Sequence, residues 1–353
     1  MKIYPFLKNL SLVYVLALVV SCVGDPIEQP IGKFESGVLI INEGSFGAND
    51  GDIHHYDPIS GDLQPNVFES ANARPFAGLI QQVRVVDGLA YIVANTGKVE
   101  IVQAADFRSV GAVNDSKLKI PRDLQVIGQK LFISDYGPYD ENWNNTESFV
   151  AVVNGLQGGA VHKQIPVPSR PEGMALIGSE LWAACASGSQ LVVINPATEE
   201  VARTVEVSAG SPHFFVQFGA NWYVYAMDAE RVYFHRINHS AYSISETISI
   251  PLANAIYNGN FTMGTNGDVY IITTSGASAR VAKVSIETGV VLDAEYFVGS
   301  NFYGLGFDSS SNTLYVGDHA GWQGNGQVWK VGPSGSLIDS FQAGRGPSGF
   351  LFR

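Results

Sequence analysis

The chain has 353 residues, of which 46% are hydrophobic and 15% are charged. This composition supplies enough apolar side chains for a large core and excludes intrinsic disorder, which is typical of chains with fewer apolar residues and a higher charge. The formal net charge is −12 at pH 7. So acidic a chain argues against binding of nucleic acid, whose phosphates are bound by clusters of Lys and Arg.

Residues 1–21 have the pattern of a secretory signal peptide, because Lys2 and Lys8 precede an apolar run too short to span a bilayer comfortably. The run ends in VVSC, which resembles the lipobox of bacterial lipoproteins, so Cys22 is predicted to be lipidated. Residues 22–36 would then tether the protein to a membrane. The alternative is a soluble secreted protein whose cysteine merely lies near an ordinary cleavage site.

The mature chain would carry 19 basic and 33 acidic side chains, because the signal contains two lysines and no acid. Acidic residues soon after Cys22 loosely resemble the export signals of Bacteroidetes surface lipoproteins, which implies an outer-membrane, surface-exposed location. Cys185 lies in the apolar context LWAACAS and is predicted to be a buried core residue. With Cys22 lipidated, no disulfide within the chain is expected.

One type of strand recurs through the remaining sequence. Each copy is rich in aromatic and β-branched residues and is closed by Asn, Asp, Gly or Ser, as is typical of short strands. The copies lie at 38–44, 89–97, 130–137, 180–188, 221–229, 268–276 and 313–321. A spacing of about 45 residues, with room for four strands in each repeat, predicts a β-propeller.

A second element with Pro or Gly near its start precedes each of these strands. Its copies lie at 74–83, 120–126, 170–176, 211–218, 255–263, 302–308 and 346–352. The first strand at 38–42 has no such element before it, whereas the chain ends on one. We therefore predict a single seven-bladed domain over 37–353, all-β, with four-stranded blades and a ring closed by pairing of the C-terminal strand into the N-terminal blade.

The repeats resemble a known family over the whole mature chain. Strands such as LAYIVANTG (89–97) and following runs such as SQLVVINP (189–196) are similar to those of the YncE-type, YVTN-like seven-bladed propellers. The resemblance supports the fold and implies little about function, since propellers carry many chemistries.

Two sets of loops are expected to share one mouth of the ring: those before the inner strands and those after the strands that follow them. Within INEGSFGANDG (41–51), Asn42 has the same register as Asn95 and Asp135 and is expected to cap a turn. The segment beyond Asn42 is longer than a turn needs and brings Phe46 to the mouth.

Aromatic and cationic side chains at this mouth are the candidate ligand-binding residues. The predicted set is Phe46, Arg74, Arg122, Tyr139, Trp143, Arg170, His213, Tyr303, Trp322 and Arg345. Exposed aromatics give rigid contact area, although they could instead pack on neighbouring loops. The arginines could form a cationic collar for an anionic or amide-rich ligand, or each could pair with an acid of the next blade, such as Asp123 or Glu172.

The segment INEGSFGANDGDIHHYDP (41–58) resembles the opening blade of Bacteroidetes surface lipoproteins. Some of these are similar to the propeller lipoprotein that captures cobalamin and passes it to a TonB-dependent outer-membrane transporter. The resemblance implies a cell-surface protein that binds a small molecule, with a corrinoid as the candidate ligand and a TonB-dependent transporter as the partner. No cofactor is expected.

Two alternatives remain open. Calcium-dependent lactonases are propellers with oxygen ligands around a central metal, and Glu172, Asn95, Asp135 and Asp318 superficially resemble that set. Against an enzyme, the sequence has no GxSxG, HExxH, paired CxxC or phosphate-loop motif, and no metal site is predicted. The second alternative is a propeller that only docks on a protein partner through its exposed aromatics.

Overall fold

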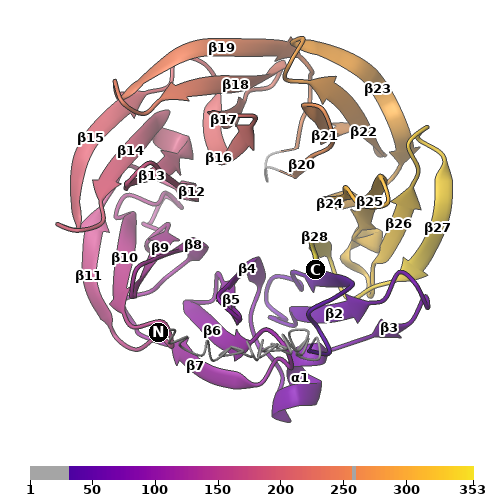
Figure 1. Ribbon diagram of the computed structural model, residues 1–353, viewed down its shortest axis with the longest axis horizontal. Helices are drawn as coiled ribbons and strands as arrows, with labels where there is room; N and C mark the ends of the chain where they lie inside the picture. Colours follow the sequence, from indigo (N-terminus) through magenta and orange to yellow (C-terminus); the bar gives the residue numbers. More distant parts are fainter. Residues whose placement is uncertain (1–31, 257–259) are drawn as a thin grey trace, which may run out of the picture. The chain divides into compact units, whose positions relative to one another are not determined.

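The computed structural model describes residues 32–256 and 260–353, and residues 32–353 form one compact unit. Antiparallel sheets stand around a central axis as the blades of a propeller (Figure 1). The predicted all-β propeller fold is confirmed. The predicted signal peptide and the lipidation site Cys22 lie outside the described residues.

Five sheets contain four strands each, which run in chain order from the inner to the outer edge. The first two comprise β4 (Ile80–Val86), β5 (Leu89–Ala94), β6 (Lys98–Gln103) and β7 (Ser109–Val113), then β8 (Pro121–Ile127), β9 (Lys130–Asp135), β10 (Phe149–Asn154) and β11 (Val161–Pro166). The third comprises β12 (Pro171–Ile177), β13 (Glu180–Cys185), β14 (Gln190–Asn195) and β15 (Glu200–Glu206), with the short 3-10 helix η1 (Ala186–Gly188). The last two comprise β16 (Ser211–Phe218), β17 (Asn221–Met227), β18 (Arg231–Asn238) and β19 (Ser243–Pro251), then β20 (Phe261–Met263), β21 (Asp268–Ser275), β22 (Ser278–Ser285) and β23 (Val290–Gly299).

The other eight strands form one sheet in the order β27-β26-β25-β24-β28-β1-β2-β3. They are β1 (Val38–Asn42), β2 (Asp52–Tyr56), β3 (Leu63–Gln64), β24 (Phe302–Asp308), β25 (Thr313–Asp318), β26 (Gln327–Val331), β27 (Leu337–Gln342) and β28 (Pro347–Phe352), and the 3-10 helix η2 (Ala320–Trp322) follows β25. The structure thus shows five separate four-stranded sheets and one eight-stranded sheet where seven four-stranded blades were predicted.

Glycines explain why β24 and β28 come together. The two inner strands share one parallel residue pair, Leu305 with Gly349. A Cβ atom on Gly304 would lie 2.5 Å from backbone atoms of β28, and one on Gly306 would lie 2.6 Å from Phe350. Only residues without a side chain permit so close an approach of the two strands.

The C-terminal strand β28 also pairs antiparallel with β1, from Val38 opposite Phe352 to Asn42 opposite Pro347. Outside β1 the sheet narrows, since β3 has two residues. The helix α1 (Val67–Asn72), which the sequence did not predict, follows β3 and contacts β2 (Figure 1). Its buried Val67 and Phe68 belong to the same hydrophobic cluster as Ile53 of β2, so the helix packs on that strand.

The core lies between neighbouring blades, where alternating apolar residues of adjacent sheets interdigitate. One cluster, for example, joins Tyr91 and Val93 of β5 to Leu131 and Ile133 of β9. Cys185 is completely buried, and burial raises the pKa of its thiol to about 12. It is a core residue, as predicted.

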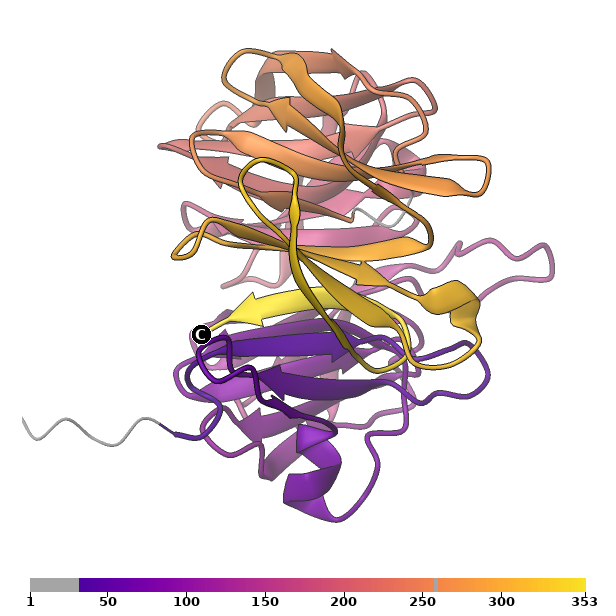
Figure 2. The ribbon, with the colours of Figure 1, turned by 90° about the vertical axis from the view of Figure 1, so that its right-hand side faces the viewer.

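The described chain begins on the face of the ring opposite the predicted mouth. Phe34 is buried with its ring against those of His55 and Phe107, and its N–H donates to the carbonyl of Ala105, in the turn after β6. The N–H of Arg353 donates to the carbonyl of Gly37, so the C-terminus lies at the same face (Figure 2). The part of the predicted tether that the structure describes is thus packed on the propeller.

Candidate functional site

A cavity of about 440 Å³ lies at the centre of the ring, where the inner strands begin. It is lined by Ile41, Glu43, Gln81, Gln82, Arg122, Glu172, Phe214, Phe215, Val216, Asn260, Phe261, Thr262, Met263, Tyr303, Leu305, Ser348 and Gly349. Its volume falls in the range of small-molecule pockets, which are commonly about 300–1,000 Å³.

Irregularities at the starts of the inner strands bring polar side chains to this cavity. The pairing register shifts by one residue in β4, β8, β12, β16, β24 and β28, as in a β-bulge. The irregular segments contain Gln81, Arg122, Glu172, His213, Tyr303 and Ser348, respectively. A bulge redirects a side chain that regular alternation would send to the other face, and bulges are frequent at functional sites.

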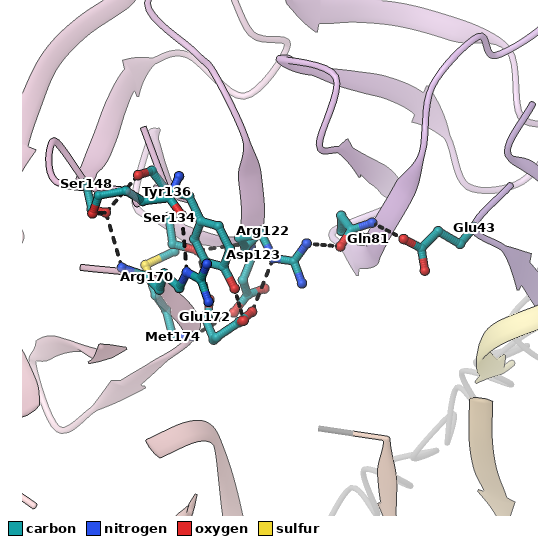
Figure 3. Close-up of polar contacts among 11 residues, drawn as sticks. Glu43, Gln81, Arg122, Asp123, Ser134, Tyr136, Ser148, Arg170, Glu172 and Met174 are labelled. Carbon is teal, nitrogen blue, oxygen red and sulfur yellow. Dashed lines mark hydrogen bonds and ion pairs between the residues drawn. The ribbon is translucent and has the colours of Figure 1, made fainter. Parts of the chain in front are cut away.

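A chain of hydrogen bonds links these residues across several sheets. Glu43, in the loop after β1, accepts from the Tyr303 hydroxyl at one carboxylate oxygen. At the other it accepts from the Gln81 amide, with 2.7 Å between Nε2 and Oε1. The Gln81 carbonyl in turn accepts from the Arg122 guanidinium (Figure 3).

The chain continues to Glu172, which is buried. Its carboxylate forms an ion pair with Arg122, with Nε and Oε2 3.2 Å apart, and accepts a hydrogen bond from the Tyr136 hydroxyl (Figure 3). The Arg122 guanidinium also lies over the Tyr136 ring, 4.9 Å from its centroid. These contacts hold Arg122 in one position, as bonds to several partners do for a planar guanidinium.

The electrostatics of the cavity follow from this arrangement. Burial by itself would lower the pKa of Arg122, but the carboxylates of Glu172 and Glu43 outweigh it and raise the pKa above its usual value. Burial lowers the pKa of His213, against the opposing influence of Glu172, so its imidazole is neutral at pH 7. Arg122 is thus a permanent cation with one carboxylate in direct contact and a second reached through Gln81.

The β16 and β20 side of the wall carries large apolar residues. Phe214 and Phe215 come from β16, and Phe261 and Met263 come from β20. The rings of Phe214 and Phe261 lie 6.4 Å apart between centroids. The cavity therefore has one hydrogen-bonding side and one aromatic side, an arrangement suited to an amphipathic ligand.

The structure brings two of the predicted residues to the cavity wall, Arg122 and Tyr303, with His213 buried in the bulge of β16. Three predicted arginines contact other groups. Arg74 forms an ion pair with Glu100 at 2.6 Å, and Arg345 forms one with Asp50 at 3.3 Å. Arg170 donates to Asn145 and lies near the Tyr136 ring.

The prediction that each arginine pairs with an acid of the next blade holds for Arg122, whereas Arg74 and Arg345 pair with acids of their own sheets and Arg170 donates to the amide of Asn145. Arg122 of β8 pairs with Glu172 of the next sheet, and Arg84 of β4 pairs with Asp123 in the same manner. Glu172 is a predicted partner of the arginines, whereas Asp123 pairs with Arg84, which is not in the predicted set. The charge of Arg122 at the cavity is therefore compensated by Glu172.

The predicted aromatic residues on the loops of the mouth face differ in whether their rings are exposed or packed against other rings. Phe46 is 95% exposed and Trp143 is 72% exposed; the Trp143 ring lies 5.6 Å from that of the half-exposed Tyr139. Trp322 instead stacks on His319, with ring centroids 4.6 Å apart, and meets Tyr303 edge-on. Trp322 thus supports a cavity residue, while the first three are available for contact.

Sequence reasoning missed Glu43, Gln81, Asn260 and the phenylalanines. In the INEG segment, Asn42 has a structural role, since its amide bonds Asp52 and the N–H of Gly344, but Glu43 faces the cavity. One signal could have located four of the bulge residues. Arg122, Glu172, His213 and Ser348 each directly follow a proline at the start of an inner strand.

Three of the candidate metal ligands, Glu172, Asp135 and Asp318, bind other groups of the protein. The Asp135 carboxylate accepts from the backbone N–H groups of Lys119, Ile120 and Gly137, and Asp318 accepts from that of Ala320. Glu172 contacts Arg122 and Tyr136. Across the described part of the chain, no three His, Cys, Asp or Glu side chains gather in a group that could hold a metal ion.

Comparison with known proteins supplies a family. The profile of a family described as a domain of unknown function (DUF5074) matches residues 36–332. No curated protein matches the chain. Among residues 32–256 and 260–353, no helix combines the length and apolar character that crossing a bilayer demands.

Solved structures share the fold at low sequence identity. A provisionally named 6-phosphogluconolactonase from Bacteroides fragilis is 12% identical with a TM-score of 0.64, over 93% of this chain and 100% of that one. A quinoprotein alcohol dehydrogenase-like protein from Bacteroides thetaiotaomicron is 13% identical with a TM-score of 0.65, over 90% and 78%. BamB from Moraxella catarrhalis is 13% identical with a TM-score of 0.52, over 90% and 88%. At these identities the likeness shows a propeller and no particular activity.

Proposed function

The chain belongs to the DUF5074 family, and we propose that it is a propeller that binds a small molecule at the central cavity for uptake by the cell. The observation that carries the proposal is the central cavity itself, with hydrogen-bonding residues on one side and aromatic residues on the other. Polar groups that converge beside apolar and aromatic surface are typical of binding sites for small molecules.

Cobalamin or another corrinoid is the ligand we propose. A corrinoid is too large to enter a cavity of this size completely, so it would lie across the mouth and place part of its rim inside. Its neutral amide groups both donate and accept hydrogen bonds. On the cavity wall, Arg122 and Gln81 can donate to them and Glu43 can accept from them. The exposed rings of Phe46, Tyr139 and Trp143 would supply apolar contact around the mouth.

We further propose that Cys22 anchors the protein in the outer membrane and that the ligand passes to a TonB-dependent transporter. In support, the described chain begins on the face opposite the cavity, so an attachment before Gly32 would leave the mouth accessible. The prediction of lipidation itself rests on the sequence, and mass spectrometry of the membrane-extracted protein would test it. A mature N-terminus without acyl chains would exclude the anchor.

We also interpret the eight-stranded sheet as two blades. One would be β24 to β27 and the other β28 with β1, β2 and β3, each ordered from inner to outer strand like the five separate sheets. A single residue pair joins the two halves, whereas β28 pairs with β1 along five positions. On this interpretation the ring has seven blades.

Calorimetry on residues 32–353 tests the ligand. Cyanocobalamin should bind, and Trp143→Ala should weaken binding by about tenfold, because an exposed aromatic anchor contributes on the order of 1–2 kcal/mol. Ile59→Ala is the control, since Ile59 is 96% exposed and lies in the turn after β2, on the opposite face. If the wild-type protein takes up no cyanocobalamin, the corrinoid proposal fails.

The lactonase-like alternative receives support only from the fold that it shares with the structure from Bacteroides fragilis. The candidate ligand Glu172 already bonds Arg122 and Tyr136, so a cation there would have to displace Arg122. Lactone hydrolysis that depends on calcium and is abolished by Glu172→Gln would favour the enzyme over the binding protein.

A further inference from the structure

The ionisable side chains on the cavity wall leave it with a negative balance. Glu43, Arg122, Glu172 and Tyr303 are the ionisable residues among those that line it in the described chain. Tyr303 donates its proton to a hydrogen bond with Glu43, and the two carboxylates outnumber the one guanidinium. An anionic group entering the cavity would meet a net negative wall and would be repelled.

An anionic ligand could not pair fully with the Arg122 guanidinium, because groups of the protein already bind it. Arg122 is in direct contact with Glu172 and reaches Glu43 through the Gln81 amide. A carboxylate or phosphate of a ligand would have to compete with Glu172 for Arg122, and displacing Glu172 would leave a buried charge without its cation. A neutral acceptor, or a donor directed at Glu43, does not incur this cost.

The aromatic side of the cavity restricts the rest of the ligand. Phe214, Phe215 and Phe261 border this side together with Met263, whose thioether adapts its shape to an apolar partner. Flat apolar groups gain both buried area and favourable ring contacts against such a wall. A ligand that satisfies both sides is therefore a flat apolar body with a hydrogen-bonding end.

We propose that the cavity selects a flat, apolar group that carries a neutral or cationic hydrogen-bond donor, and that it rejects the same group when it carries a carboxylate. This proposal rests on the proposed function, in that the cavity is taken as the ligand site, and it names the class of ligand. Charge selection arises from Glu43 and Glu172, and the apolar body lies against Phe214 and Phe261.

Three probes of similar shape test this selection. Tryptamine, tryptophol and 3-indolepropionate share an indole ring on a two-carbon chain and end in an ammonium, a hydroxyl and a carboxylate, respectively. Ligand-observed NMR on residues 32–353 should give the order tryptamine, then tryptophol, then 3-indolepropionate, with at least a tenfold difference in Kd between the first and the last. Equal binding of the three, strongest binding of 3-indolepropionate, or no binding of any probe would each overturn the proposal.

Glu43→Gln tests the origin of the selection. Removal of one cavity carboxylate should reduce the preference for tryptamine over 3-indolepropionate by about tenfold, as one charge at close range in a partly buried site would. Glu287→Gln is the matched control, because Glu287 is exposed in the turn between β22 and β23 on the opposite face. An equal effect of the two variants would mean that the selection reflects overall charge and not the cavity. If Glu43→Gln does not fold, the order of the three probes on the wild-type protein decides the proposal.

The outcome separates this inference from the proposed ligand. Indole probes that bind in the expected order while cyanocobalamin does not would retain the ligand class and remove the corrinoid. Binding of cyanocobalamin with no selection among the probes would retain the uptake protein and remove the class proposed here.

Discussion

Replacement of Arg122 by methionine should strongly destabilise the propeller, because it leaves the Glu172 carboxylate buried without its cation. The side chain of Glu172 is 4% exposed, and its carboxylate also accepts a hydrogen bond from the Tyr136 hydroxyl. Breaking a buried ion pair on one side costs about 3–5 kcal/mol, and the remaining Tyr136 bond sets our expectation at about 3 kcal/mol. The free energy of unfolding in urea, followed by tryptophan fluorescence, measures the loss.

A matched pair elsewhere in the ring provides the control. Arg84→Met removes the cation from Asp123, which is as buried as Glu172, but the Asp123 carboxylate also accepts from the backbone N–H groups of Leu124 and Met174. Because those donors remain, the cost should be lower, about 1–2 kcal/mol. In addition, Arg122→Met combined with Glu172→Gln should be more stable than Arg122→Met alone, since the neutral amide removes the unpaired charge. An equal loss in Arg84→Met and Arg122→Met, or a double variant less stable than Arg122→Met, would refute this reasoning.

Four further results are expected. Deletion of residues 347–353 removes β28 and exposes the edge of β1, so the protein should lose cooperative unfolding or associate through that edge, as calorimetry and light scattering would detect. Gly346 and Gly128 have similar positive φ angles, but a Cβ atom at Gly346 would overlap the Trp322 ring, whereas one at Gly128 meets nothing. Gly346→Ala should therefore cost more stability than Gly128→Ala, and equal losses of unfolding free energy in urea would contradict this. Phe34→Ala should release the N-terminal segment and raise hydrogen exchange at residues 33–36 without unfolding the ring, whereas Ile59→Ala should not. Burial lowers the pKa of both His213 and His235. The unfolded chain therefore takes up protons before the folded protein does as the pH falls below 6.5, and the free energy of unfolding should decrease there. A urea midpoint that does not fall between pH 7 and 5, or that falls as much in His235→Gln as in the wild type, would exclude this contribution.

The sequence by itself determined the repeat and hence the fold class. Short runs of β-branched and aromatic residues recur at nearly regular spacing, and this periodicity is a local property of the chain. The predicted strands at 89–97 and 130–137 are β5 and β9, and the burial of Cys185 followed from its apolar neighbours. Local pattern sufficed for these features because each depends on residues adjacent in sequence.

Only the tertiary structure decided which side chains face the cavity. Glu43 meets Gln81, 38 residues along the chain, and Tyr303, 260 residues along, and such partners cannot be read from local pattern. A bulge of one residue redirects a side chain that regular alternation would send to the other face, and the bulge in β4 contains Gln81, which lines the cavity. The eight-stranded sheet also could not be predicted from local pattern. The glycines of β24 matter because they allow close approach to β28, and the two strands meet only in the closed ring. Periodicity specifies strands, whereas the register between strands distant in sequence specifies the site.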